Sequence, residues 1–441
     1  LLSKGVPFEH IKTIKQVAFL QDKTLDLPKV KSWNTVSLSS HEDCLNDKLK
    51  YAANFKIVEV ESNKWQANRI TQDVGDQTLI INPPYKTMTE KEIDTSFDLP
   101  YTREPHPRYK KRGTIPAYEM IKFSINMHRG CFGGCSFCTI SAHQGKFIAS
   151  RSEKSILNEL NEVVELPEFK GYISDLGGPS ANMYKMKGKD ESICERCVSP
   201  SCIHPVICNN LDTSHKSMTK LYRKVDEHPK VKKAFVGSGI RYDLLVDDFN
   251  KNNDDGNHDE YIEQVITRHV SGRLKVAPEH TSDQTLKVMR KPSFKYFHKF
   301  KEKYDKISEK HNLNQQLVPY FISSHPGCED VDMANLAAET KDMGFQLEQV
   351  QDFTPTPMTV ATVIYYAGVH PYTLKPVDTV KTKKEKQDQN KFFFWYKKEN
   401  RSWIKNKLNK AQRPDLLEKL IGPDTNKEMP PWLEKRRRKK R

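Results

Sequence analysis

The sequence predicts an α/β protein whose strands form a parallel sheet. From about residue 120, apolar segments with a two-residue period alternate with segments of helical period. Six strand candidates separated by crossover helices favour parallel pairing. The 441 residues accommodate one barrel-sized domain with appendages. No apolar run approaches the roughly 20 residues that cross a bilayer, so we expect no membrane association.

The N-terminal part, residues 1–115, shows little periodicity and is predicted to be an extension that wraps over the core. It begins with Leu1, and its first residues resemble the interior of a longer sequence, so we expect a partial chain. The core is expected at 116–355, with a cysteine-rich insertion at 179–211. Residues 356–430, which include FFFWY, are predicted to form a small C-terminal subdomain.

The first strand of the core is predicted at 121–127, and Ser152 is placed to cap the helix after it. The apolar face of this helix consists of Ile156, Leu160, Val163 and Val164. The other strand candidates are 171–176, 233–236, 273–277, 316–322 and 345–351. Such a sheet is either a partial barrel or open and doubly wound. Both place functional residues in loops after the C-terminal ends of the strands.

Chemically distinctive residues follow five of these strands, which predicts that they meet at one face. In chain order they are residues 131–138, Gly177 and Gly178, then Gly237, Ser238 and Gly239, then Glu279, and finally residues 325–328.

Almost half of the formal net charge of +15 lies at the C-terminus. Residues 435–441, within a tail at 431–441, form an unbroken run of seven basic side chains. Such a run is interpreted as an RNA contact, a localisation signal or a solvated disordered tail.

Seven of the nine cysteines fall into two tight groups, which favours metal ligation over disulfides and predicts a reducing, cytoplasmic location. The first group, in RGCFGGCSFC, comprises Cys131, Cys135 and Cys138. Three thiolates in a glycine-rich loop can hold a cubane cluster and leave one iron open for a ligand. The alternative is a zinc knuckle that takes a fourth ligand such as His128 or His143.

The spacing C-x3-C-x2-C, with Phe137 before the last cysteine, resembles the cluster signature of the radical S-adenosylmethionine (SAM) superfamily. HRGCFGGCSFCTISAHQGKFIASRS, GSGIRYDLL, LKVAPEH, VPYFISSHPGC and QVQDFTPTPMT are together similar to the YgiQ-type radical SAM proteins. NPPYKTMTEKEID and LPYTREPHPRY extend the resemblance into the N-terminal part. That group usually carries an N-terminal α/β domain resembling cobalamin-binding folds, which this chain lacks, so we expect a fragment or a lineage that lost it.

The resemblance implies a partial (β/α)6 barrel in which the three cysteines hold a [4Fe-4S] cluster and SAM binds its fourth iron. It also implies an external one-electron donor such as a flavodoxin or ferredoxin. Carried over by position, the cofactor-binding residues are Phe137, Gly177, Gly178, Gly237, Ser238, Gly239, Arg241 and Glu279. The glycines are explained equally well as tight turns, and Arg241 and Glu279 as a mutual ion pair.

The second group, C-x2-C-x4-C-x5-C, comprises Cys194, Cys197, Cys202 and Cys208. Four thiolates within fifteen residues suit either zinc or an auxiliary iron-sulfur cluster, with His204 and His215 as substitute ligands.

Two cysteines stand apart from both groups. Cys328 is either a functional thiol or a helix-start residue, and Cys44 has no partner pattern and is interpreted as inert.

Two classes of function are therefore predicted. The leading one is a radical SAM oxidoreductase or transferase that cleaves SAM reductively to a 5'-deoxyadenosyl radical. Its substrate is left open among RNA, methyl or sulfur transfer and small-molecule rearrangement. The competing one is a non-catalytic RNA-binding protein stabilised by zinc or iron-sulfur.

Overall fold

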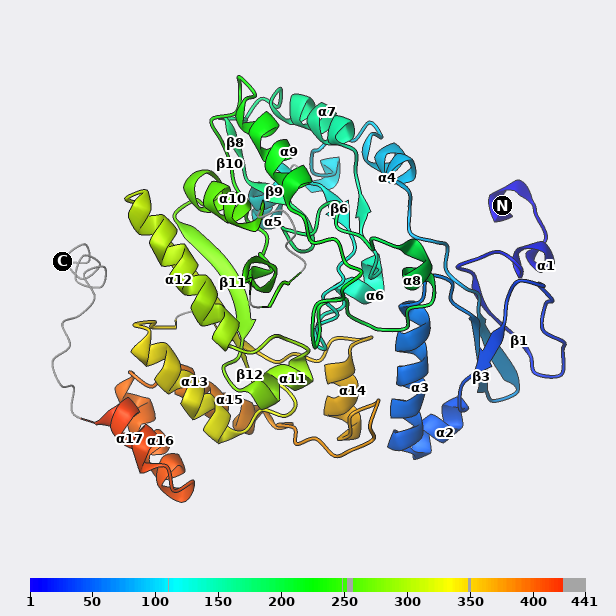
Figure 1. Ribbon diagram of the computed structural model, residues 1–441. Helices are drawn as coiled ribbons and strands as arrows, with labels where there is room; N and C mark the ends of the chain where they lie inside the picture. The colour runs from blue at the N-terminus through cyan, green and yellow to red at the C-terminus, as the bar shows by residue number, and fades with distance from the viewer. Residues whose placement is uncertain (110, 248, 252–256, 348–349, 423–441) are drawn as a thin grey trace.

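The computed structural model of the chain is shown in Figure 1. It describes residues 1–109, 111–247, 249–251, 257–347 and 350–422. The basic run at 435–441 therefore lies outside the described residues.

The N-terminal part contains more regular structure than an extended wrap. It holds a four-stranded sheet in the order β1-β4-β3-β2, flanked by helices, at the right of Figure 1. Gly75, with φ +57°, begins the two-residue turn between β3 and β4, a hairpin signal already present in the sequence VGDQ. The elements are β1 (Ala18–Asp22), β2 (Thr35–Ser37), α2 (His41–Asn46), α3 (Lys48–Ser62), β3 (Arg69–Val74), β4 (Gln77–Ile81) and α4 (Glu90–Phe97).

The central part contains the expected parallel strands, and they adjoin in chain order. β5 pairs with β9, β8 with β10, β11 with β12, and β12 with β13, all in parallel. A parallel bridge between Ile240 and Val276 joins the third strand region to β11. Doubly wound sheets reverse their strand order at a switch point, whereas these pairings do not. The strands are β5 (Ser124–Asn126), β8 (Tyr172–Ile173), β9 (Asp175–Gly177), β10 (Lys233–Ala234), β11 (Arg273–Glu279), β12 (Gln316–Ser323) and β13 (Gln351–Asp352).

Three strand predictions were too long, and in one of them, 233–236, only β10 (Lys233–Ala234) is a strand. Pro116 opens helix α5 (Pro116–Ile121), so Ile121 ends a helix, 61% exposed, and the first strand begins only at Ser124. Within the described part of 345–351, only Gln351 belongs to a strand, which is β13 (Gln351–Asp352).

Helices cover the strands and bury one continuous apolar core. Ser152 caps α7 (Glu153–Val163) by accepting a hydrogen bond from the Ser155 N–H, as predicted. Ile156, Leu160 and Val163 from that helix are fully buried. The other covering helices are α9 (Lys216–Asp226), α10 (Asn257–Gln264), α11 (Asp283–Met289), α12 (Lys295–Lys310) and α13 (Asp330–Asp342).

The C-terminal helices contribute to cores formed with earlier parts of the chain. α14 (Val360–Ala367) packs on α3, and the two lie side by side in Figure 1. α15 (Lys383–Phe393) contributes Phe392 and Phe393 to the main core, which identifies FFFWY as a packing segment. α16 (Lys398–Lys410) and α17 (Pro414–Ile421) also join this core.

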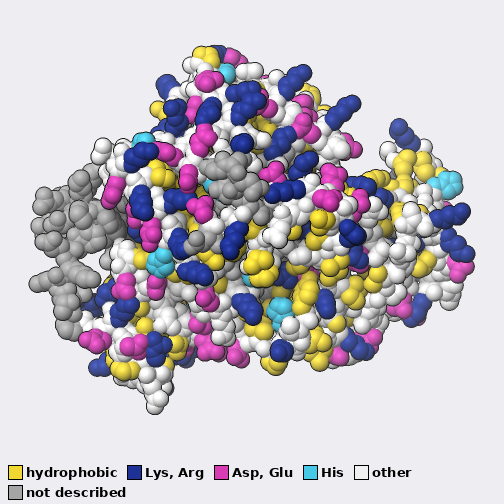
Figure 2. All heavy atoms as spheres, viewed as in Figure 1, with side chains coloured by type: hydrophobic (Ala, Val, Ile, Leu, Met, Phe, Trp, Pro, Cys, Tyr) yellow, Lys and Arg dark blue, Asp and Glu magenta, His cyan; other side chains and the backbone are white. Residues whose placement is uncertain are grey.

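The surface seen in Figure 2 carries basic and acidic side chains interspersed over the whole face. Among the described residues, no helix combines the length and apolar character that a membrane crossing requires.

Candidate metal centre

The three-cysteine loop lies between β6 (His128–Arg129) and α6 (Ile140–Gln144) and is held from three directions. The Cys131 N–H donates to the Gly145 carbonyl at 3.0 Å, and the Ser136 N–H donates to the Met289 carbonyl at 3.0 Å. The Ala361 N–H at the start of α14 donates to the Ser136 carbonyl at 2.8 Å. Backbone bonds thus fix the loop without using any cysteine sulfur.

The three thiols of this loop are free, half-buried and close enough to influence one another. Burial, reinforced by the neighbouring Cys135 thiolate, raises the pKa of Cys131 to about 11 and also raises the pKa of Cys138. Thiols that resist ionisation alone become ligands when a metal replaces their protons. The loop therefore fits a thiolate-bound cluster.

The geometry of ligands around a single metal ion differs from that of cysteines around a cubane cluster. Among the described residues, no three His, Cys, Asp or Glu side chains surround one point as ligands of one metal ion do. Around a cubane, each cysteine binds a different iron atom.

Arg241 supplies positive charge beside the loop. Its Nη1 lies 3.6 Å from the Cys135 sulfur, and its Nε and Nη2 donate to the two carboxylate oxygens of Asp243 at 2.9 and 2.5 Å. The alternative pairing of Arg241 with Glu279 is therefore wrong, because Arg241 pairs with Asp243 and Glu279 faces Lys291. Burial acts to raise the pKa of Asp243, but the Arg241 charge outweighs it and holds that pKa below its ordinary value.

Gly177 and Gly178, at the end of β9, leave no room for side chains. A Cβ on Gly178 would lie 2.4 Å from the His128 ring, and one on Gly177 would lie 2.9 Å from the Ser238 hydroxyl. The His128 ring is fully buried, and neither nitrogen has a hydrogen-bond partner among the described residues. Burial, followed by the charge of Arg129, lowers the pKa of His128 to about 4, so the imidazole is neutral.

Asp175 positions the Gly237–Gly239 segment, a role that the sequence analysis did not predict. Its carboxylate accepts from the Gly237 N–H at 2.8 Å and from the Ser238 hydroxyl at 2.5 Å. A Cβ on Gly239 would meet no atom within 4 Å. The predicted residues after the second and third strands thus lie together. An aspartate at the start of β9, two residues before Gly177, was the available signal.

Glu279 lies at the end of β11 with φ +71°, a left-handed conformation that is unusual for glutamate. Its carboxylate is 3.8 Å from the Lys291 ammonium, and burial raises its pKa. The Lys291 ammonium also donates to the Ala277 carbonyl at 2.6 Å.

Phe137 and Cys328 both lie near buried histidines on the same face. The Phe137 ring packs edge-on against the His325 ring, with centroids 5.8 Å apart, and His325 Nε2 is 3.4 Å from the Ser136 hydroxyl. The Cys328 sulfur is 3.3 Å from His280 Nε2. Burial raises the pKa of Cys328 and lowers the pKa of His280 to about 3, so the pair is uncharged. Cys328 lies two residues before α13, next to the N-cap residue Glu329, in agreement with the helix-start interpretation.

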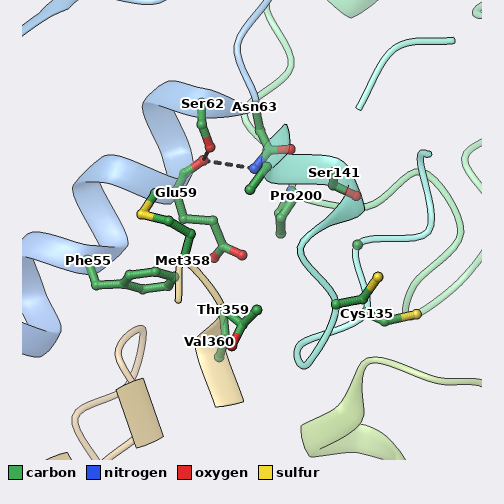
Figure 3. A pocket seen from close by; sticks show the side chains of 13 residues that line it. Phe55, Glu59, Ser62, Asn63, Cys135, Ser141, Pro200, Met358, Thr359 and Val360 are labelled. Carbon is green, nitrogen blue, oxygen red and sulfur yellow. Dashed lines mark hydrogen bonds between the residues drawn. The ribbon is translucent and has the colours of Figure 1, made fainter. Parts of the chain in front are cut away.

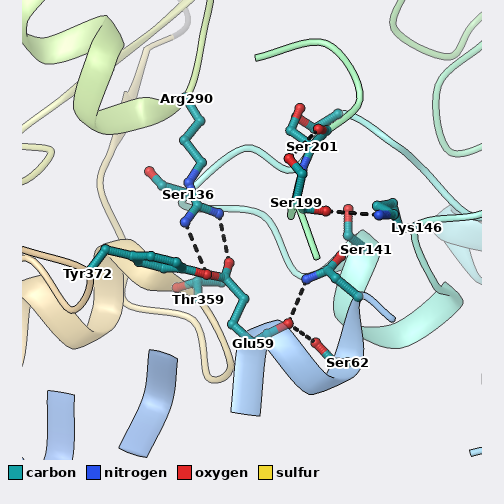
Figure 4. Close-up of polar contacts among 12 residues, drawn as sticks. Glu59, Ser62, Ser136, Ser141, Lys146, Ser199, Ser201, Arg290, Thr359 and Tyr372 are labelled. Atoms are coloured by element: carbon teal, nitrogen blue, oxygen red, sulfur yellow. Dashed lines mark hydrogen bonds and ion pairs between the residues drawn. The ribbon is translucent and has the colours of Figure 1, made fainter. Parts of the chain in front are cut away.

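A pocket beside Cys135 and Cys138 is closed by α3 and by the start of α14. Figure 3 shows Glu59, Met358 and Pro200 around it. Glu59 forms a two-fold ion pair with Arg290 at 2.7 and 3.0 Å and accepts from the Tyr372 hydroxyl at 2.5 Å (Figure 4). Three parts of the chain thus meet at the edge of the cysteine loop.

The four-cysteine insertion packs directly against this loop. The Cys202 N–H donates to the Phe132 carbonyl at 3.0 Å, and the Ser201 hydroxyl donates to the Gly133 carbonyl at 2.8 Å. Gly134 has φ +61°, and a Cβ there would lie 2.5 Å from the Pro200 carbonyl oxygen, so only glycine permits this approach. The two cysteine groups are therefore neighbours.

His204 and His215 are the predicted substitute ligands for the four-cysteine group. His215 is buried against Asn182, His258 and Tyr261. Burial, with the charge of Arg290, lowers the pKa of His204 to about 4. Cys44 is buried in the N-terminal part, where Asn54 donates to its sulfur at 3.0 Å.

Comparison with known proteins identifies relatives over most of the chain. A family profile described as "Radical SAM N-terminal" matches residues 1–124, and a domain of unknown function (DUF3362) matches residues 348–441. UPF0313 proteins of Bacteroides thetaiotaomicron and Porphyromonas gingivalis are 59% and 56% identical, over 93% and 96% of the chain. The matched region covers 66% and 67% of the length of these two relatives. A UPF0313 protein of Pseudomonas putida is 40% identical over 92% of this chain and 52% of its own. The chain thus spans between about half and two thirds of these relatives.

Among solved structures, the chain is similar to the radical SAM methyltransferase TsrM from Kitasatospora setae. The structure with cobalamin and a [4Fe-4S] cluster has a TM-score of 0.35 and 11% identity, covering 58% of this chain and 43% of TsrM. The structure with tryptophan and a SAM analogue has a TM-score of 0.32 and 12% identity, covering 55% and 39%.

Proposed function

The chain belongs to the UPF0313 family of YgiQ-type radical SAM proteins, and from that membership we propose that it binds a [4Fe-4S] cluster and cleaves SAM reductively. The observation that carries the proposal is the three-thiol loop with the Arg241 guanidinium 3.6 Å from the Cys135 sulfur. When bound, the cluster supplies the electron for cleavage of SAM to methionine and a 5'-deoxyadenosyl radical. A partial (β/α)6 barrel is proposed as the scaffold, supported by parallel pairings in chain order.

The chain's own residues would hold and orient the cofactors. Cys131, Cys135 and Cys138 would bind three irons, and Arg241 would offset part of the thiolate charge. The backbone at Gly177 and Gly178 would approach SAM closely, because neither residue has a side chain there. The neutral His128 ring, with one donor and one acceptor nitrogen, is available to the same ligand.

Residues from the third and fourth strands complete the proposed SAM site. The Gly237–Gly239 segment is fixed by Asp175 and would carry ribose contacts through Ser238 and the backbone. Glu279, raised in pKa by burial, would face SAM from the end of β11. Phe137, packed on His325, would border the cluster.

An external one-electron donor such as a flavodoxin or ferredoxin is the proposed partner, and a reducing cytoplasm the proposed location. RNA binding through the basic tail also stays a proposal, since that tail lies outside the described residues. The mixed charges of the face in Figure 2 do not add to the RNA proposal.

Anaerobic reconstitution of the purified chain tests the proposal. We expect a brown protein that carries about four irons at the three-cysteine loop and converts SAM to 5'-deoxyadenosine when dithionite is added. Cys135→Ala should abolish this conversion. Cys44→Ser is the matched control, because Cys44 lies outside both groups and serine keeps an acceptor for Asn54. A colourless protein that forms no 5'-deoxyadenosine would refute the enzyme proposal.

A further inference from the structure

Lys146 is a buried lysine placed next to the four-cysteine insertion. Lys146 is only 2% exposed. Its ammonium donates hydrogen bonds to the Ser199 carbonyl at 2.8 Å and to the Cys197 sulfur at 3.6 Å. Figure 4 shows the contact with Ser199. Within the described residues, Lys146 forms no ion pair with a carboxylate. Its nearest source of negative charge is therefore the cysteine group.

The four thiols of the insertion lie close to one another and to this ammonium. Burial raises the pKa of Cys202 to about 12; the Lys146 charge opposes this shift, and the thiolates of Cys197, Cys208 and Cys194 add to it. The same lysine opposes the raised pKa of Cys194. The Asn210 side-chain amide also donates to the Cys194 sulfur at 3.5 Å. Two sulfurs of the group thus already receive hydrogen bonds.

A buried ammonium that has no carboxylate partner is unfavourable unless another negative charge faces it. A metal bound by the neighbouring cysteines supplies that charge, because it holds the sulfurs as thiolates. Four thiolates around a divalent ion or a doubly charged cubane leave a net negative charge, which the lysine then offsets.

We propose that Cys194, Cys197, Cys202 and Cys208 hold a second thiolate-bound metal centre, and that Lys146 is the cation that stabilises it. Lys146 is a positioning residue: it acts on the metal through the Cys197 sulfur and through the Ser199 carbonyl, which fixes the loop between Cys197 and Cys202. The chemistry is common to an auxiliary iron-sulfur cluster and to zinc, but a single zinc ion would require the sulfurs to move together, because no three ligand side chains of the described residues surround one point.

Lys146 also connects the second centre to the first loop. It follows Gly145, whose carbonyl accepts from the Cys131 N–H, while Cys202 bonds to the Phe132 carbonyl. Cys131 and Cys202 both border one small apolar cluster that includes Phe132, Met183 and Leu244. The second centre is therefore attached to the first by two separate backbone connections.

The test removes the first site so that only the second is measured. In the full chain with Cys131, Cys135 and Cys138 all replaced by alanine, metal analysis should still find about four irons with sulfide, or about one zinc. Either result supports the second centre and identifies its metal. A metal-free protein would overturn the proposal.

Lys146→Met in this background tests the lysine. We expect the metal to be held about 10- to 100-fold more weakly against a chelator, and an iron-sulfur form to have a more negative midpoint potential. Lys146→Arg should retain metal to within a few-fold. Lys303→Met is the control, because Lys303 also donates to a backbone carbonyl, that of Leu245 at 3.1 Å, but has the Asp259 carboxylate as its charged partner at 2.6 Å.

Equal metal retention in the Lys146→Met and Lys303→Met proteins would overturn the role of Lys146. If the methionine variant does not fold, Lys146→Gln removes the charge but keeps a donor for Ser199 and gives the same comparison. Formation of 5'-deoxyadenosine is measured separately, in Lys146→Met with the first loop intact. Failure of the SAM proposal is thereby distinguished from failure of this one.

Discussion

Arg241 and Asp243 form a buried ion pair next to Cys135, and Asp243 is the partner on which the arginine depends. Asp243→Asn removes the counter-charge and leaves the guanidinium buried beside thiols. We expect the free energy of unfolding in urea to fall by about 3–5 kcal/mol, with loss of iron from the first site.

The chain contains a matched control for this pair. Arg413 and Asp415 have the same two-residue spacing and the same two-fold hydrogen bonding, but they lie at the surface. Asp415→Asn should leave the unfolding midpoint almost unchanged, because exposed ion pairs contribute little. Equal effects of the two substitutions would show that burial of the Arg241 pair is unimportant.

Gly178 is required by contact with His128, whereas Gly239 has open space around it. Gly178→Ala would drive a methyl group into the imidazole, and we expect a loss of about 1–3 kcal/mol in unfolding free energy. Gly239→Ala should be tolerated in the folded protein, because its Cβ would meet no atom within 4 Å. Thermal unfolding of the two variants checks this order, and a more destabilised Gly239 variant would contradict it.

At the level of elements, Glu59 of α3 joins the N-terminal part to α11 and to the segment after α14. Glu59→Gln leaves the Arg290 guanidinium with a neutral partner, and we expect unfolding free energy to fall by about 3 kcal/mol. Hydrogen exchange should increase in α3 and in residues 358–372, since Tyr372 also loses its charged acceptor.

A more exposed ion pair, between α2 and α3, serves as the comparison for Glu59. Lys50 of α3 bonds to Asp43 of α2 at 2.7 Å, and both side chains are largely exposed. Asp43→Asn should not change exchange in residues 358–372. Unchanged exchange after Glu59→Gln would show that the Glu59–Arg290 contact does not hold these segments together.

Sequence periodicity predicted the parallel strands and the capped helix α7, because buried alternation and a Ser152 cap are local features. It placed the first strand too early, since Pro116 starts a helix across Ile121. It missed the N-terminal sheet despite the Gly75 turn, because strands β1 and β2 are short and separated from their partners. Contacts such as Arg241 with Asp243 in preference to Glu279 depend on side-chain directions that spacing does not specify.

For the candidate site, too, local features were predicted from the sequence and contacts between distant segments were not. The cysteine spacing predicted both thiol groups, but not that Cys202 would bond to the Phe132 carbonyl across about 70 residues. Lys146 was not singled out from the sequence, and His128 was named only as the fourth ligand of an alternative zinc knuckle. Their roles arise from burial, which becomes visible only when distant segments meet.

For the whole molecule, buried neutral histidines predict acid sensitivity. Burial lowers the pKa of His280 and of His325 to about 3, whereas the unfolded chain binds protons at these residues near pH 6.5. The unfolded state therefore takes up more protons as the pH falls. The contribution of these two histidines to the free energy of unfolding is fully present above pH 6.5. It is lost progressively as the pH drops toward 3.

His280→Asn tests this pH dependence. In the wild-type protein the Ser282 N–H donates a hydrogen bond to His280 Nδ1 at 3.0 Å, and the asparagine side chain keeps an acceptor for it. Between pH 6 and 4, the slope of unfolding free energy against pH should be smaller in the variant by roughly 1.4 kcal/mol per pH unit. Urea titrations of both proteins at each pH measure the difference. Parallel slopes would mean that His280 is protonated equally in the folded and unfolded states.

The hydrogen bond from Cys202 to the Phe132 carbonyl also constrains how the protein matures. With Ser201 and Pro200 in place, residues 199–202 cover the backbone of the loop that carries Cys131 and Cys135. If the loop binds the proposed cluster, we expect an assembly protein to deliver iron and sulfide while the insertion is still open. Maturation would then follow an order, in which the first site is loaded before the insertion packs against it.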